Sequence, residues 1–222
     1  MSHQYGRSQN KLCTSPDRGL KRGLLFFLLL ASAAVISAQP ASSDWPSQNL
    51  NLQNSRFSPL DEINTRNVSS LALRWSFEPG LRDDITQVTP LVVDGVMYLH
   101  SRATMYALDA VSGAELWRRP LDSGPANGPV RGSTYAEGRI YAYRGADLYA
   151  FDASTGDALA SFGDLGVLKV VAEALHHQYP DTYPTDIDPV TIGYRLTTPP
   201  SFHEGIIYVA AALSEGHIPG GL

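Results

Sequence analysis

The 222-residue chain has a single cysteine, Cys13, and it lies ahead of the segment that we expect to form the mature domain. One cysteine cannot form a disulfide within the chain, so stability must come from packing or from a ligand. The chain also lacks a cluster of Lys and Arg, which excludes the phosphate-binding surface of a nucleic-acid-binding protein. It contains no nucleotide-binding glycine loop and no Gly-x-Ser-x-Gly element. Ile207 stands where a zinc motif that begins at His203-Glu204 needs its second histidine.

Long apolar runs are equally scarce, and the one that is present reads as a leader. Residues 23–36 form an apolar stretch after Lys21-Arg22, and the following Ser37-Ala38 is a plausible cleavage site. The stretch has about 14 residues, whereas a membrane-spanning helix needs roughly 20. We therefore expect residues 1–38 to be a signal peptide, with no stable transmembrane anchor beyond this leader. Residues 39–222 carry 12 Lys and Arg against 21 Asp and Glu, so the exported part has a net charge of −9.

What the sequence does contain is an internal repeat. The phrase Asp-Ala-Val-Ser-Gly-Ala-Glu-Leu at residues 109–116 returns as Asp-Ala-Ser-Thr-Gly-Asp-Ala-Leu at residues 152–159. The offset is 43 residues, within the range of roughly 40–50 for one four-stranded propeller blade. Each copy follows an apolar run that contains Tyr. We expect a strand, a tight turn held by the Asp side chain, and a second strand.

A second phrase follows the same period. An acidic residue and Gly precede a short apolar strand with Tyr at the same place, in Asp94-Gly95, Glu137-Gly138 and Glu204-Gly205. The first two copies are again 43 residues apart, and the third comes 67 residues after the second. A unit of this kind cannot bury its apolar face alone and must stack on neighbours. The sequence thus predicts an all-β fold, a partial β-propeller of about two and a half four-stranded blades.

The domain organisation follows from these repeats. Residues 39–70 are polar and turn-rich and read as an extended lead-in segment. The incomplete propeller spans residues 71–222, beginning with an alternating strand at residues 71–77. An insertion at about 167–194 breaks the period, with a short helix at residues 168–176. Because a propeller avoids exposed sheet edges by closing its ring, we expect the chain to be a fragment, or part of a larger assembly.

These residues carry a resemblance to a known family. The order Asp44-Trp45, then residues 89–98, then residues 107–117 resembles the N-terminal part of the pyrroloquinoline quinone (PQQ)-dependent quinoprotein alcohol and glucose dehydrogenases. The resemblance implies an eight-bladed propeller that holds PQQ and usually Ca²⁺ near its axis. It covers residue 45 to the end, about the first third of a full-length member. It also implies a tryptophan-docking role for Trp117, whereas Ala160 stands at the equivalent place of the second copy.

The resemblance implies several cofactor-binding residues. Arg131, in an Arg-Gly-x-x-Tyr motif, would contact the polar groups of the quinone; the alternative is a rim Arg in a surface ion pair. Thr197 would hydrogen-bond the cofactor, or Thr198 if the register shifts by one; the alternative is a strand-end Thr without a ligand. Gln87 stands where many members have a Glu that faces the cofactor. Glu215 would be a Ca²⁺ ligand, although acidic residues in surface loops are common.

The implied activity is the oxidation of an alcohol, sugar or polyol to a carbonyl compound in the periplasm, with electrons passing to cytochrome c or a membrane quinone. The adjacent-cysteine disulfide of many alcohol-oxidising members is absent, which favours the sugar and polyol branch. The catalytic Asp is expected beyond residue 222, so the parent would be the enzyme and the fragment alone inactive. The alternative is a non-catalytic propeller scaffold of the cell envelope.

Overall fold

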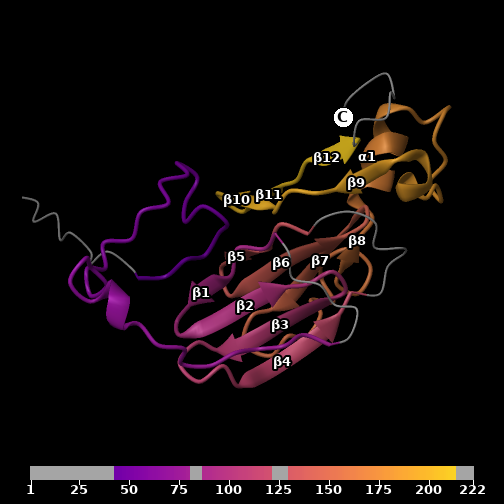
Figure 1. The fold of residues 1–222 in the computed structure, drawn as a ribbon. Coiled ribbons are helices and arrows are strands. Elements are labelled where there is room, and N and C mark those ends of the chain that lie inside the picture. The colour runs from indigo at the N-terminus through magenta and orange to yellow at the C-terminus, as the bar shows by residue number, and fades with distance from the viewer. Residues whose placement is uncertain (1–42, 81–86, 122–129, 214–222) are drawn as a thin grey trace, which may run out of the picture. The chain divides into compact units, whose positions relative to one another are not determined.

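The computed structural model of this chain describes residues 43–80, 87–121 and 130–213. The chain divides into two compact units, Met1–Ala38 and Gln39–Leu222, and every described residue belongs to the second unit. That unit consists mainly of short antiparallel strands, which confirms the predicted all-β class (Figure 1). Among the described residues, no helix is both long and apolar enough to cross a bilayer.

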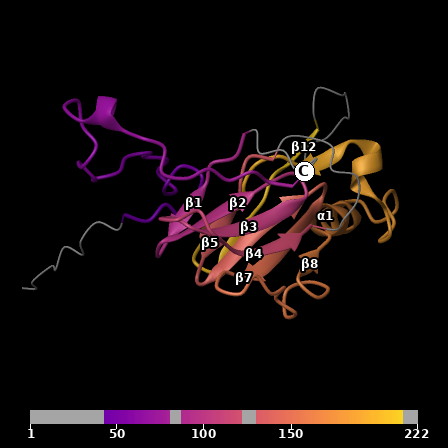
Figure 2. The same cartoon turned by 60° about the horizontal axis from the view of Figure 1, so that its bottom comes forward.

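Two four-stranded antiparallel sheets repeat at the predicted period, with the strand orders β1-β2-β3-β4 and β5-β6-β7-β8. The first three strands of the second sheet begin 43 residues after their counterparts in the first. Figures 1 and 2 show the two sheets packed against each other. The strands are β1 (Leu91–Val93), β2 (Val96–His100), β3 (Thr104–Asp109), β4 (Glu115–Pro120), β5 (Thr134–Ala136), β6 (Arg139–Arg144), β7 (Asp147–Asp152) and β8 (Val167–Leu168).

The third repeat is a long hairpin that is interrupted in the middle. Strand β10 (Ser201–His203) pairs with β11 (Ile206–Tyr208), and β9 (Tyr194–Leu196) pairs with β12 (Ala211–Leu213). Four residues, 197–200, lie opposite only two, 209–210, so the first arm bulges. Pro199 and Pro200 have no backbone N–H to donate to the ladder, which explains why pairing stops there.

The insertion is ordered around one helix. Helix α1 (Val170–Gln178) begins two residues later than expected and buries Val171, Ala172 and Leu175. A 3-10 helix, η2 (Pro189–Ile192), is capped by Asp188, which accepts a hydrogen bond from Val190 N at 3.0 Å. Another short 3-10 helix, η1 (Val68–Ser70), lies in the lead-in segment. Strand β8 pairs with β7, so the first two residues of the expected insertion still belong to the second sheet.

The acidic-Gly turns have the predicted conformation. Asp94, Glu137 and Glu204 each adopt a positive φ near 50°, and the Gly that follows each has a φ of 75–80°. A two-residue hairpin whose two central residues both have positive φ matches the right-handed twist of its strands. The three turns join β1 to β2, β5 to β6 and β10 to β11.

The Asp turns also repeat in their main-chain hydrogen bonds, whereas the serine hydroxyl comes from the third residue after Asp109 and from the second residue after Asp152. Asp109 Oδ1 accepts hydrogen bonds from Ser112 N at 2.7 Å and Ser112 Oγ at 2.6 Å. Asp152 Oδ1 accepts from Thr155 N at 3.0 Å and Ser154 Oγ at 2.6 Å. These bonds, first of all those from the serine side chains, lower the pKa of both carboxyl groups.

The lowered pKa values predict a dependence of stability on pH. Because each folded-state pKa lies below the unfolded value of about 4, the stabilisation is complete above that value and is lost as pH falls through the folded pKa. An Asp109→Asn/Asp152→Asn double variant cannot titrate at these sites. We expect its free energy of unfolding, measured by urea denaturation between pH 6 and pH 3, to fall less steeply than that of the unsubstituted chain. Parallel curves would contradict this assignment.

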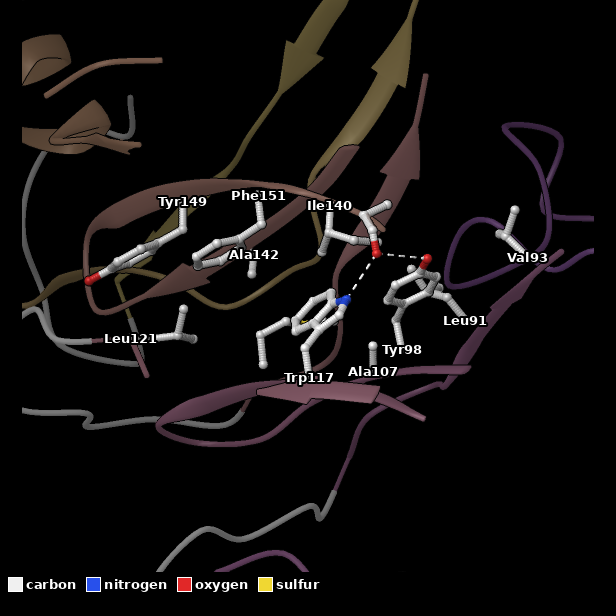
Figure 3. Packing of buried hydrophobic residues seen from close by; sticks show 12 residues of the cluster. Leu91, Val93, Tyr98, Ala107, Trp117, Leu121, Ile140, Ala142, Tyr149 and Phe151 are labelled. Carbon is white, nitrogen blue, oxygen red and sulfur yellow. Dashed lines mark hydrogen bonds between the residues drawn. The ribbon is translucent and has the colours of Figure 1, made fainter. Parts of the chain in front are cut away.

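The core between the first two sheets is built around Trp117. Its indole Nε1 donates to Ala153 O at 3.0 Å, and Tyr98 Oη donates to the same carbonyl at 3.2 Å. Figure 3 shows both bonds converging on this oxygen. The indole lies against Gly156, where an added Cβ would be 2.6 Å from Trp117 Cδ2. The remaining core members are apolar side chains from both sheets: Leu91, Val93, Met105, Ala107, Leu121, Ile140, Ala142, Tyr149, Phe151 and Ala153.

The strand expected at residues 71–77 is wrong: no regular strand forms there in the described residues. Trp75 nevertheless repeats the contacts of Trp117 one repeat earlier. Its Nε1 donates to Ala110 O at 3.2 Å, and a Cβ at Gly113 would lie 2.5 Å from Trp75 Cδ2. The segment therefore occupies the place of an outer strand, but the described residues offer it no neighbouring strand to pair with. Only the second half of the alternating apolar face is docked: Trp75 and Phe77 are half-buried, whereas Leu71 and Leu73 are exposed.

Candidate functional site

The segments that precede β1, β5 and β10 meet at one place. Thr89 N donates to Arg131 O at 3.4 Å, and Arg131 Nη1 donates to Thr197 O at 3.0 Å. Strand β5 also contacts both β1 and β10. Three consecutive repeats thus bring one residue each to a common junction, although Thr89 and Thr197 are more than a hundred positions apart.

Arg131 is the centre of this junction. Its side chain is half-buried, and the bond to Thr197 uses one of the five N–H donors of a guanidinium. The remaining donors suit planar acceptors such as carboxylates or adjacent carbonyl oxygens. The neighbouring Gly132 is buried and has a φ of 141°, a conformation that residues with a Cβ rarely adopt.

The bulge in the third repeat explains why Thr197 reaches Arg131. In an uninterrupted hairpin the Thr197 carbonyl would face a partner strand, but residues 197–200 are released from the ladder. The bulge is fixed at its other end by the Thr134 hydroxyl, which donates to Pro200 O. Thr197 is half-buried and Thr198 is exposed. The structure joins Thr197 to Arg131, and among the described residues no hydrogen bond joins Thr198 to Arg131. The choice between the two threonines as a cofactor ligand stays a prediction.

Gln87, another expected site residue, is not joined to this junction in the described part of the chain. Gln87 is exposed, two residues before Thr89, and no hydrogen bond links it to Arg131 or Thr197 within the described ranges. Glu215 lies outside the described residues. In the described part of the chain no three His, Cys, Asp or Glu side chains gather in a way that could hold a metal ion.

Two buried rings next to Arg131 were missed by the sequence analysis. Tyr143 Oη accepts a hydrogen bond from Arg131 N at 3.0 Å, and His100 Nδ1 lies 2.9 Å from Gly132 O. The rings meet edge to face, with centroids 5.2 Å apart. Burial raises the pKa of Tyr143, partly offset by Arg131. The signal was present in the sequence, because His100 and Tyr143 are 43 residues apart and hold the same position in two repeats.

A cavity of about 510 Å³ lies beside the junction. It is lined on one side by residues 46–54 of the lead-in segment and on the other by Thr134, Tyr135 and residues 199–203. The lead-in segment is held there because Tyr135 N donates to Pro46 O at 2.9 Å and Trp45 pairs with Val92. Neither Arg131 nor Thr197 lines this cavity, so it is distinct from the predicted cofactor contacts.

Comparison with known proteins connects this arrangement to a family. The family model described as "PQQ: Glucose/ethanol/alcohol dehydrogenase, beta-propeller domain" matches residues 45–217. The lanthanide-dependent methanol dehydrogenase of Methylacidiphilum fumariolicum (strain SolV) is 38% identical over 162 residues, which are 66% of this chain and 26% of that protein. The quinoprotein glucose dehydrogenase of Escherichia coli (strain K12) is 29% identical over 215 residues, 83% of this chain and 25% of that protein.

The fold agrees with a solved structure as well. A europium-containing methanol dehydrogenase superposes with a TM-score of 0.59 at 30% sequence identity. The match covers 78% of this chain and 28% of that chain. The chain thus spans about a quarter of the length of the relatives it matches. Together with the family match, this likeness confirms the predicted partial β-propeller.

Proposed function

Because the chain belongs to the PQQ-type glucose/ethanol/alcohol dehydrogenase β-propeller family, we propose that it supplies part of the PQQ site of a dehydrogenase. The parent protein would oxidise an alcohol, a sugar or a polyol to a carbonyl compound. The observation that carries the proposal is the junction at which Arg131 and Thr197, both named from the sequence, are joined at 3.0 Å.

The residues at the junction fit a quinone that carries acidic groups. The half-buried guanidinium of Arg131 would hold carboxylate or carbonyl oxygens bidentately, and it acts more strongly where water is partly excluded. Thr197 or Thr198 would add a hydroxyl donor, and Gln87 an amide. PQQ supplies the chemistry of the oxidation by taking up two electrons, whereas the residues of this chain bind and orient it.

A metal ligand, a general base and electron acceptors complete the proposed enzyme. Glu215 would provide one carboxylate ligand for Ca²⁺, and the lanthanide-dependent relative suggests that a trivalent ion deserves the same test. The catalytic Asp is proposed to lie beyond residue 222. The signal peptide that the sequence predicts at residues 1–38 would direct the protein to the periplasm, and cytochrome c or a membrane quinone would accept the electrons.

A second candidate is a non-catalytic propeller scaffold, and one observation favours it. The Arg131 guanidinium already has a partner within the chain, the Thr197 carbonyl, as an arginine with a purely structural role would have. The docking tryptophans Trp75 and Trp117 would serve a scaffold equally well. The two candidates therefore differ in whether the Arg131 junction binds a cofactor.

Titration with PQQ distinguishes them. We expect PQQ, added to the full-length parent with Ca²⁺ or La³⁺, to quench tryptophan fluorescence and to raise the melting temperature. Since a hydrogen bond to a charged group contributes about 1.5–3 kcal/mol, Arg131→Ala should weaken PQQ binding by about 10- to 150-fold. Arg131→Lys keeps the charge but loses the planar fork, and should weaken binding by about tenfold.

The matched control is Arg119→Lys, because Arg119 forms an ion pair with Asp157 at 3.0 Å on the outer strand β4. It should leave PQQ affinity unchanged. Absence of binding to the unsubstituted full-length parent would favour the scaffold. Binding that is equally strong in the Arg131→Ala variant would remove Arg131 from the site.

A further inference from the structure

We infer that His100 and Tyr143 are positioning residues that hold the Arg131–Gly132 main chain and thereby orient the guanidinium of Arg131. The role of Arg131 toward PQQ rests on the proposed function. The contacts of His100 and Tyr143 with the Arg131–Gly132 main chain lie within this chain and can be tested without a cofactor.

Tyr143 holds the first half of the segment. It lies on β6, is 1% exposed, and its hydroxyl oxygen accepts the Arg131 N–H at 3.0 Å. Arg131 precedes β5 by three residues, so no strand ladder is there to satisfy this amide. Removing the hydroxyl would leave an amide without its acceptor, which in a partly buried place is costly. The Tyr143 ring therefore fixes where the Arg131 backbone lies.

His100 holds the second half from the preceding sheet. It is the last residue of β2, is fully buried, and its Nδ1 lies 2.9 Å from Gly132 O. Since a carbonyl oxygen only accepts, Nδ1 must carry the proton in this bond. The two side chains thus hydrogen-bond the N–H of Arg131 and the C=O of Gly132 from two different sheets, and their rings pack against each other edge to face.

The repeat indicates that this support is specific to the Arg131 junction. Tyr98, Tyr141 and Tyr208 occupy equivalent positions, so the positions two residues later, His100, Tyr143 and Ala210, are equivalent as well. The third repeat has Ala there, which cannot form a side-chain hydrogen bond. Polar rings therefore stand on both sides of the one segment that carries the arginine.

Orientation of Arg131 matters because a bidentate contact needs both ends of the side chain in place. The backbone is fixed by Tyr143 and His100, and the guanidinium by Thr197 O. An arginine that is ordered before the ligand arrives loses less conformational entropy when it binds. Loosening the backbone should therefore weaken PQQ binding even though neither ring is assigned a contact with PQQ.

The first test compares Tyr143→Phe with Tyr98→Phe. Both tyrosines are buried, both hydroxyls bond a main-chain group, and burial raises both pKa values, that of Tyr98 to about 12. We expect Tyr143→Phe to speed hydrogen exchange of the Arg131 amide at least tenfold, measured by NMR on a sample with ¹⁵N-labelled arginine. Tyr98 bonds Ala153 O instead, so Tyr98→Phe should leave the exchange rate of the Arg131 amide unchanged. An unaltered Arg131 amide in Tyr143→Phe would overturn the inference.

The second test asks whether the support acts through Arg131. Tyr143→Phe and His100→Phe should each weaken PQQ binding by about five- to tenfold, and Tyr98→Phe by less than twofold. In the Arg131→Ala background the effect of Tyr143→Phe should shrink to less than twofold, because the side chain that it orients is absent. An undiminished effect in that background would contradict a positioning role.

The outcomes separate this inference from the proposed function. Faster exchange at Arg131 in a Tyr143→Phe parent protein whose unsubstituted form does not bind PQQ would overturn the proposed function and leave the positioning role of Tyr143 and His100 intact. PQQ binding that depends on Arg131 but not on Tyr143 or His100 would overturn the inference alone.

Discussion

Replacing Trp117 with alanine should lower the free energy of unfolding by about 3–5 kcal/mol, the usual cost of removing a large aromatic side chain from a packed core. Trp117 is only 7% exposed and contacts residues of both sheets. The substitution also leaves Ala153 O with one donor, Tyr98, in place of two. We expect a single cooperative transition in urea at a much lower midpoint.

Two companion variants test the physical reason. Trp117→Phe keeps an aromatic ring but removes the indole N–H, and should cost about 1–2 kcal/mol. Trp75→Ala should cost less than Trp117→Ala, because Trp75 is only half-buried and its segment has no paired strand in the described residues. A Trp117→Ala variant within about 1 kcal/mol of the unsubstituted chain would mean that the two sheets are not held together by this residue.

The repeat could be predicted because its turns depend on hydrogen bonds and backbone conformations of residues that are close in the sequence. The Asp turns and the acidic-Gly turns depend on residues within a few positions of one another, and the structure confirms them in each copy that it describes. The two four-stranded sheets follow from the same period. Local hydrogen bonding and the positive φ of glycine leave few alternatives for such short segments.

Trp75 shows where sequence patterns mislead. Alternating side chains at residues 71–77 indicate a strand, yet the structure places Trp75 and Phe77 against the outer side of the first sheet with no ladder. Alternation indicates that one face of a segment is apolar, and it does not report that the backbone is paired. Aligning Trp75 with Trp117, 42 residues later, would have revealed the docking role.

The second repeat departs from the first where the docking tryptophan is missing. Ala160 is exposed. Phe162, two residues later, packs edge to face against Tyr141 of the same sheet, with ring centroids 5.9 Å apart, in a cluster that also contains Phe202 and Ile207 of the third repeat. The outer strand is short: β8 has two residues where β4 has six. The sequence indicated the loss of the tryptophan at Ala160 but not this cluster.

The site was predictable only in part. Arg131 and Thr197 were named from motifs. Their contact depends on the bulge at residues 197–200, which contains a pair of prolines and which the motifs do not reveal. His100 and Tyr143 do not stand in any motif, so only their equivalence within the repeat could have identified them. Residues that act through another residue leave a weaker sequence signal than residues that touch a ligand.

Replacing Gly156 with alanine is expected to cost about 3 kcal/mol of stability, and Gly138→Ala, its matched control, about 1 kcal/mol. Both glycines have nearly the same φ, 72° and 75°, so an added Cβ strains both backbones equally. They differ in surroundings. A Cβ at Gly138 meets nothing within 4 Å, whereas at Gly156 it would lie 2.6 Å from Trp117 Cδ2.

The difference between the two variants therefore isolates the contact of the indole with its turn. If Trp117 is first replaced by alanine, the clash disappears, and Gly156→Ala should then cost no more than Gly138→Ala. Urea denaturation of Trp117→Ala, Gly156→Ala, Gly138→Ala and the Trp117→Ala/Gly156→Ala double variant measures this coupling. Equal costs at Gly156 and Gly138 in the unsubstituted background would show that the indole can move aside freely. The tryptophan would then not be the element that sets the spacing between the two sheets.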